Sequence, residues 1–165
     1  MMTEDEKLEK FIAELRFFHY LRKIAPLRRD EYYLVTKLRF HTGEERFVNV
    51  LHRMYYVYDN DKTGIIAAIC LYSPLVYDFN GRSHVVNSIT GIREDLSNSS
   101  DYTVLSPREC QVLALIDSGM KSKEIAETLN ISIHTVNRHR QEILAALNVK
   151  NSHEACRIAK SMSLI

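Results

Sequence analysis

Hydrophobic residues recur at every third or fourth position from Lys7 to Lys23, the spacing that gathers them along one side of an α-helix. Proline cannot continue such a helix, and the next proline along the chain is Pro26. The pattern therefore predicts an amphipathic helix that is stopped by Pro26. Its apolar positions are Leu8, Phe11, Ile12, Leu15, Phe18 and Leu21.

The pattern then becomes that of β-strands. Residues 31–40, 46–58 and 65–72 are rich in β-branched and aromatic side chains, and residues 41–45 and 59–64 between them have the composition of hairpin turns. Strands joined in this way form an antiparallel meander. An Asn80-Gly81 turn then leads into a last strand near residues 84–89.

Two of these runs raise questions of packing. Residues 65–72 are apolar on both faces, which predicts a strand covered on each side by a helix or by a partner subunit. Its Cys70 is expected to lie in a core rather than to sense redox state. The aromatic run at residues 54–58 fits a dimer face, because tyrosines bury area at low entropic cost, and fits equally a sheet surface beneath the first helix.

Residues 93–103 are polar and rich in serine, which is typical of a linker. We therefore expect an N-terminal sensor or dimerisation domain at residues 1–97, a linker at residues 98–103, and a second domain at residues 104–165.

The second domain has helical periodicity throughout. Ser106 at a cap, Pro107 at the first helical position and Glu109 two residues later form a helix-start signature. Gly119 is expected to end this helix and Asn148 to end the third. Ser122, Ser132 and Ser152 are predicted to cap helices that run to Leu129, Leu147 and about Met162. The second and third helices are joined by only a few residues, which forces a sharp angle between them.

The third helix, residues 133–147, has one apolar side and one side of hydrogen-bonding residues. His134, Asn137, Arg138 and Gln141 fall at i, i+3, i+4 and i+7, opposite the apolar positions. Asparagine and glutamine can bind adenine through two hydrogen bonds, arginine can bind guanine in the same way, and an α-helix fits the major groove. A polar helix face is also compatible with simple solvation.

Composition limits the other possibilities. The 165 residues carry a formal charge of +1, with −1 up to residue 104 and +2 after it, so an anionic partner must be recognised by a local patch. Three cysteines without a CxxC pair fit reduced thiols and a cytoplasmic location. No apolar run is long enough to span a membrane, and the acidic start is not that of a signal peptide.

An enzyme is not expected, because the common nucleophile, phosphate-binding and zinc motifs are missing from the sequence. No metal or cofactor is predicted, and the scattered His19, His41, His52 and His84 are expected to be ordinary histidines. The competing interpretation is a protein-interaction module that uses the sheet of the first half and does not read DNA directly. A third helix that bound protein would show apolar anchors on its exposed side, where the sequence instead has Asn137, Arg138 and Gln141.

The stretch LSPRECQVLALIDSGMKSKEIAETLNISIHTVNRHRQEILAALNV closely resembles the LuxR/NarL-type (FixJ- or GerE-type) helix-turn-helix domain of bacterial transcription regulators. The resemblance implies a DNA-binding transcriptional regulator. It places Lys123, Thr135 and His139 against the DNA backbone and Asn137, Arg138 and Gln141 against base edges. It also implies that the fourth helix either contributes to a dimer or merely covers the core. The residues expected to maintain the fold are Glu109, Ile125, Ala126, Leu129, Val136, Ile143 and Leu147.

The strand series of the first half is similar to the last three strands of a PAS domain, with too few residues before it for a complete one. The expected architecture is an α+β N-terminal domain, made of a helix and an antiparallel PAS-like sheet, followed by an all-α domain of four helices. The expected partners are double-stranded DNA and a second copy of the chain, with RNA polymerase as a further candidate. A small-molecule ligand is not identified by the sequence.

Overall fold

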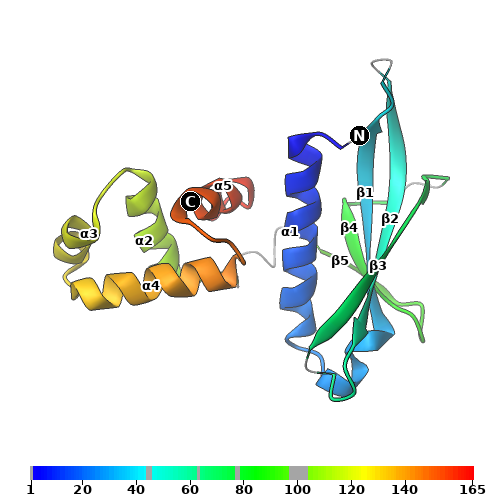
Figure 1. Cartoon of the computed structure of the whole chain (residues 1–165), viewed down its shortest axis with the longest axis horizontal. Helices are drawn as coiled ribbons and strands as arrows, with labels where there is room; N and C mark the ends of the chain where they lie inside the picture. The colour runs from blue at the N-terminus through cyan, green and yellow to red at the C-terminus, as the bar shows by residue number, and fades with distance from the viewer. Residues whose placement is uncertain (1, 44–45, 63, 77–78, 97–103) are drawn as a thin grey trace. The chain divides into compact units, whose positions relative to one another are not determined.

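The computed structural model describes the chain except for residues 1, 44–45, 63, 77–78 and 97–103. It divides into two compact units, Met1–Ser97 and Asn98–Ile165 (Figure 1). The linker predicted at residues 98–103 lies outside the described residues. A helix with an antiparallel sheet, followed by an all-helical unit, is the fold class that the sequence predicts.

The first unit begins with α1, Glu4–Leu21. Its start is capped by Thr3, whose hydroxyl accepts a hydrogen bond from the Glu6 N–H, and three acidic residues occupy the first turn, where they stabilise the helix dipole. The helix ends before Pro26, and that proline instead opens a short 3-10 helix, Pro26–Glu31, that the sequence analysis did not predict.

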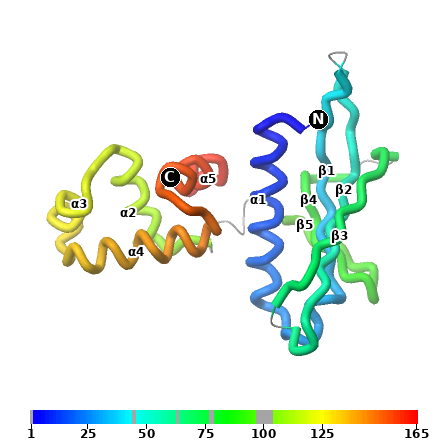
Figure 2. Tube along the Cα trace, in the orientation of Figure 1, coloured from blue at the N-terminus to red at the C-terminus, as the bar shows by residue number. Residues whose placement is uncertain are grey.

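Five strands follow and form one antiparallel sheet in the order β3-β2-β1-β4-β5 (Figures 1 and 2). The predicted meander is confirmed, and β4 is the predicted last strand. The short β5 lies where the sequence predicted the start of a linker, so that prediction was wrong for these three residues. The likeness to a PAS domain stays a prediction. The strands are β1 (Tyr32–His41), β2 (Phe47–Tyr58), β3 (Ile65–Pro74), β4 (Ser83–Asn87) and β5 (Arg93–Asp95).

The turn before β4 shows why glycine follows Asn80. Gly81 has a φ of +75°, and a Cβ atom at this position would lie 2.7 Å from Asp95 Oδ1 of β5. Only glycine combines a left-handed backbone with this close approach. The predicted turn is thus present.

Helix α1 packs on one face of the sheet and forms the main core of the unit (Figure 1). Phe17 is fully buried and its ring stacks on Tyr56 at 5.4 Å between centroids. The position of Tyr56 therefore agrees with the interpretation in which residues 54–58 form a sheet surface beneath the first helix. The other buried members of this core are Ala13, Leu21, Leu34, Met54, Val85 and Leu96.

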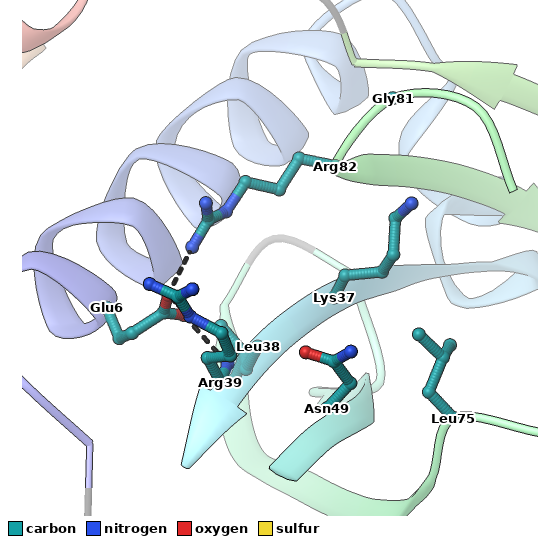
Figure 3. A pocket seen from close by; sticks show the side chains of 8 residues that line it. All are labelled: Glu6, Lys37, Leu38, Arg39, Asn49, Leu75, Gly81 and Arg82. Carbon is teal, nitrogen blue, oxygen red and sulfur yellow. Dashed lines mark hydrogen bonds and ion pairs between the residues drawn. The ribbon is translucent and has the colours of Figure 1, made fainter. Parts of the chain in front are cut away.

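A buried carboxylate also connects α1 to the sheet (Figure 3). Glu6 Oε1 lies 2.8 Å from Arg82 Nη2, and Glu6 Oε2 accepts a hydrogen bond from the Arg39 N–H at 3.0 Å. These residues line an open groove of about 470 Å³ together with Lys37, Leu38, Asn49, Leu75 and Gly81. These contacts compensate the cost of burying the Glu6 carboxylate, and they hold the start of α1 against β1 and the start of β4.

Strand β3 forms an edge of the sheet, and its side chains from Ile65 to Tyr72 are exposed. The predicted cover by helices on both sides is therefore wrong for the described residues, whereas cover by a partner subunit stays a prediction. Cys70 is consequently exposed, and its expected place in a core was wrong. A run of apolar residues predicts a strand, but it does not show whether other parts of the chain cover that strand.

The second unit consists of α2 (Pro107–Asp117), α3 (Ser122–Leu129), α4 (Ile133–Ala146) and α5 (Ser152–Ser161). The predicted start of α2 is confirmed: the Ser106 hydroxyl accepts from the Glu109 N–H, and the Glu109 carboxylate accepts from the Ser106 N–H at 2.7 Å. Gly119 and Asn148 have positive φ after α2 and α4, as predicted.

Two predicted caps are displaced by one residue. Helix α3 is preceded by Lys121, whose N–H donates to Glu124 Oε2 at 2.6 Å, and Ser122 is its first residue. Helix α5 is capped by Asn151, whose Oδ1 accepts from the Glu154 N–H at 2.9 Å.

The four helices enclose one apolar core. Helix α4 packs against α2 and α3, and α2 also packs against α5. Of the residues expected to maintain this fold, Leu129 is half-buried and Glu109 acts through the cap of α2. The fourth helix, α5, covers the core through Ala155 and Ile158 and through Met162 at its end, and its part in a dimer stays a prediction. The expected core residues that are buried are Ile125, Ala126, Val136, Ile143 and Leu147.

Candidate nucleic-acid interface

The junction between α3 and α4 is a three-residue turn that contains a left-handed residue. Asn130 has a φ of 51° and ends α3, and the Ile131 N–H donates to the Ala126 carbonyl at 3.0 Å. Ser132 then caps α4 by accepting from the Thr135 N–H at 3.0 Å. One end of the turn is therefore fixed by a backbone hydrogen bond, and the other by a hydrogen bond from a backbone N–H to the Ser132 side chain.

Helix α4 has the two sides that the sequence predicts. Val136, Ile143 and Leu147 are at most 1% exposed and anchor one side in the core. The other side carries exposed His134, Asn137, Arg138 and Gln141. The structure thus brings the predicted base-reading residues Asn137, Arg138 and Gln141 together on one solvent-facing surface.

The residues predicted to contact the DNA backbone are more dispersed. Thr135 and His139 lie on the flank of α4 and are half-buried, whereas Lys123 is exposed near the start of α3. The Thr135 hydroxyl lies 2.9 Å from the Ser132 hydroxyl, so it is part of the helix cap. Two of these three residues belong to α4, and the third comes from the neighbouring helix α3.

A carboxylate lies beside this surface. Glu142 Oε1 accepts a hydrogen bond from Arg138 Nε at 2.8 Å, and Glu142 Oε2 lies 3.3 Å from His139 Nδ1, without the geometry of a hydrogen bond. The bond from Arg138 lowers the pKa of Glu142 and raises that of Arg138. The surface therefore carries an ion pair rather than a free guanidinium.

Two arginines that were not predicted as site residues connect the helices of this unit. Arg140 donates to the Ser122 hydroxyl and to the Ser152 hydroxyl, each at 3.2 Å, and so joins α4 to the starts of α3 and α5. Arg108 donates to the carbonyl of Leu129 at 2.8 Å, the last residue of α3. Both arginines are half-buried in the structure. In the sequence, however, nothing distinguishes them from arginines exposed to solvent, because each lies on a helix among other charged residues.

The remaining candidate chemistry of the chain is sparse. Within the described residues, no three His, Cys, Asp or Glu side chains are grouped so that they could hold a metal ion. The His52 side chain is fully buried. Two of the free cysteines lie inside the fold, Cys156 buried and Cys110 half-buried.

Among the helices in the described part of the chain, none combines the length and the apolar character needed to cross a membrane.

Comparison with known proteins supports the assignment of the second unit. Residues 103–159 match the family model described as GerE, bacterial regulatory proteins of the luxR family. The oxygen regulatory protein NreC of Staphylococcus aureus (strain MRSA252) is 32% identical over 108 residues, which cover 64% of this chain and 50% of that protein. NreC of Staphylococcus epidermidis (strain ATCC 12228) is 33% identical over 109 residues, with the same coverages. The chain thus spans about half the length of these relatives.

Likeness to solved structures over the whole chain is low. A structure of the Vibrio cholerae VqmA dimer aligns with 88% of this chain and 59% of that chain, at 16% identity and a TM-score of 0.36. The domain assignment comes from the family match and from the turn and helix geometry described above. Residues 103–159 are a helix-turn-helix domain of the LuxR family of bacterial regulatory proteins.

Proposed function

We propose that this chain binds double-stranded DNA in a sequence-dependent manner and regulates transcription, with α4 as the recognition helix in the major groove. The observation that carries the proposal is the exposed surface of Asn137, Arg138 and Gln141, held on a helix whose opposite side is locked in the core. These side chains can form paired hydrogen bonds with purine edges.

The other contacts follow from the position of α4. Thr135 and His139 on its flank and Lys123 on α3 are proposed to bind the phosphate backbone. Such contacts fix the register of the protein on the duplex but carry no sequence information. Ile133, the first residue of α4, is an apolar side chain beside this surface and is 46% exposed.

The unit carries a net charge of only +2 from Leu105 to the end, so one copy is expected to hold a single site weakly. We propose that two copies bind a two-fold or repeated element, and that the N-terminal unit provides dimerisation or signal input. A contact with RNA polymerase would follow from the regulatory role.

An alternative is a protein-interaction module that uses the PAS-like sheet and does not read DNA directly. If α4 itself bound a protein, an apolar partner would lie against it, yet beyond Ile133 the exposed side of this helix presents mainly amide, guanidinium and imidazole groups. The observation therefore favours a nucleic acid.

A selection of bound duplexes from a random pool, made with the full chain at low salt, tests the proposal. We expect enrichment of one motif, whose repeat or two-fold spacing reports the number of bound copies. Absence of any affinity for duplex DNA in gel-shift assays at low salt would contradict the proposal.

A further inference from the structure

Strand β3 is an unprotected edge of the sheet. Edge strands of monomers are normally protected from pairing by charged residues, proline or bulges. From Ile65 to Ser73 there is no charged residue and no proline, and the bulge opposite Val57 and Tyr58 affects only the start of the strand. Its large side chains are exposed: Ile65 45%, Ile66 69%, Ile69 50%, Leu71 48% and Tyr72 45%.

The free backbone groups of this edge can be assigned. The Leu75 N–H donates to the Asn49 carbonyl at 3.2 Å, directly beyond the Val50–Pro74 pair that ends the strand. Residues of an antiparallel pair alternate between bonding their neighbour and facing away from it. Ala68, Cys70 and Tyr72 therefore turn their N–H and C=O groups to the free edge. Pro74 has the same phase, and its missing N–H ends the stretch that can pair.

We propose that β3 pairs in antiparallel orientation with β3 of a second copy of this chain, about a two-fold axis at Ile69. This register places Ala68 opposite Cys70 of the second copy, and both residues belong to the set with free backbone groups. The two sheets then continue into one, as in strand addition to an exposed edge.

The sizes of the side chains are also compatible with this register. Ala67, Ile69 and Leu71 lie opposite Val57, Tyr55 and Arg53 of β2, so they share the face of the sheet that is turned away from α1. Across the proposed axis, small Ala67 meets large Leu71 and Ile69 meets itself. On the α1 face, two small residues, Ala68 and Cys70, meet each other. The strand is thus complementary in size to its own reverse.

A second copy of this chain is favoured over a strand of another protein, because β3 has no charged side chain that could select such a partner. An identical strand supplies both the matching side chains and the matching free N–H and C=O groups. The inference rests on the dimerising role proposed for the N-terminal unit, and it names the surface that performs this role. It does not require that the chain binds DNA.

Oligomeric state is the first test, made by sedimentation of the full chain without DNA over a range of micromolar concentrations. We expect a concentration-dependent dimer for the wild type and a monomer for Ile69→Lys. Val48→Lys is the matched control, since Val48 is 44% exposed on β2 beyond the end of β3, and this variant should remain dimeric. A monomeric wild type, or an Ile69→Lys variant that still dimerises, would overturn the inference.

Cross-linking tests the register. With the three native cysteines replaced by alanine, Ile69→Cys should form a disulfide-linked dimer on mild oxidation. Residues facing each other in a non-hydrogen-bonded pair have Cα atoms about 4.5 Å apart, within the disulfide range of about 4.4–6.8 Å. Leu71→Cys should not cross-link, because its counterpart would be four residues away along the strand. The reverse result would exclude the axis at Ile69.

The outcome is separable from DNA binding. A monomeric wild type that still shifts duplex DNA would remove this inference alone, and a dimer without affinity for DNA would remove the DNA-binding proposal alone.

Discussion

Arg138, the arginine proposed to read a base, is bonded to Glu142 one turn further along α4. Its Nε donates to Glu142 Oε1 at 2.8 Å. If α4 reads DNA as proposed, the arginine has to exchange a carboxylate for a base edge, and the carboxylate itself repels nearby phosphates. We therefore expect this pair to lower the affinity of the proposed recognition surface for DNA.

Removal of this carboxylate is predicted to strengthen DNA binding. Glu142→Gln should raise affinity for all duplexes roughly two- to fivefold, because it releases Arg138 and removes a negative charge near the phosphates. Fluorescence anisotropy with cognate and random duplexes measures the change. Glu127→Gln, on exposed α3 outside the recognition helix, is the control for loss of one negative charge. Unchanged or weaker binding by Glu142→Gln would show that this carboxylate does not compete with DNA.

Substitutions of the proposed base-reading residues and of the proposed backbone-binding residues should weaken DNA binding in different ways. Asn137→Ala and Arg138→Ala are expected to weaken the cognate site roughly 5- to 150-fold and to relax base preference at their positions. Lys123→Ala should weaken all sequences alike and make the salt dependence shallower. Competition titrations against single-base variants of the selected site separate the two patterns. An equal loss at every sequence for all three variants would contradict these roles.

Arg140 is predicted to position the recognition helix without contact to DNA. Its two hydrogen bonds to Ser122 and Ser152 join three helices, and a lysine has no fork of donors with which to make both. Arg140→Lys should lower the free energy of unfolding of the helical unit by about 1–3 kcal/mol, as expected for charge-assisted hydrogen bonds. Thermal unfolding followed by circular dichroism measures the loss, and Lys160→Arg serves as a control on an exposed residue. An unchanged melting transition would show that the two serine contacts carry no stability.

The helical unit was more predictable than the sheet because its signals are local. Ser106, Glu109, Gly119 and Asn148 act within a few residues of a helix end, and each behaves as its sequence predicts. The displaced caps at Lys121 and Asn151 arise where two adjacent residues compete. The Glu124 carboxylate accepts a hydrogen bond from the Lys121 N–H, whereas the Asn151 side-chain oxygen accepts one from the Glu154 N–H.

The environment of β3 and the contacts of Arg140 depend on residues far apart in sequence. Whether a strand is central or at an edge is decided by the order of strands in the sheet, and the apolar sequence of β3 is compatible with both. Arg140 reaches serines that are 18 and 12 residues away, at the starts of two other helices. No spacing rule within one helix predicts such a contact.

The buried carboxylate of Glu6 is predicted to stabilise the N-terminal unit. Glu6→Gln leaves one oxygen acceptor for two donors, Arg82 and the Arg39 N–H, and should cost about 1–3 kcal/mol. Glu9→Gln is the matched control: its carboxylate lies 3.5 Å from Arg82 Nε but is more exposed, 38% against 8%, so at most about 0.5 kcal/mol is expected. Urea unfolding followed by tyrosine fluorescence reports mainly this unit, because eight of the nine tyrosines precede residue 98 and the chain has no tryptophan. Equal losses for both variants would contradict a special role for Glu6.

His52 is predicted to make the stability of the N-terminal unit depend on pH. It is fully buried, its ring stacks on Tyr72 at 4.7 Å, and neither ring nitrogen has a hydrogen-bond partner among the described residues. Burial, and secondarily the charge of Lys10, lower its pKa from 6.5 to about 4. The folded unit therefore holds this side chain neutral over a range in which the unfolded chain binds a proton.

The sign follows from this difference. The contribution of His52 to stability is fully present above pH 6.5, is lost as the pH falls from 6.5 to about 4, and does not change below that. At 1.36 kcal/mol per pKa unit, the loss is about 3 kcal/mol at most. His52→Phe keeps an aromatic ring against Tyr72 and cannot titrate, so its stability should fall less over the same range. Urea unfolding of both proteins between pH 7 and pH 4 isolates the difference, since the carboxylates that also titrate there are common to both. Parallel curves for the two proteins would mean that His52 is protonated in the folded unit as readily as in the unfolded chain.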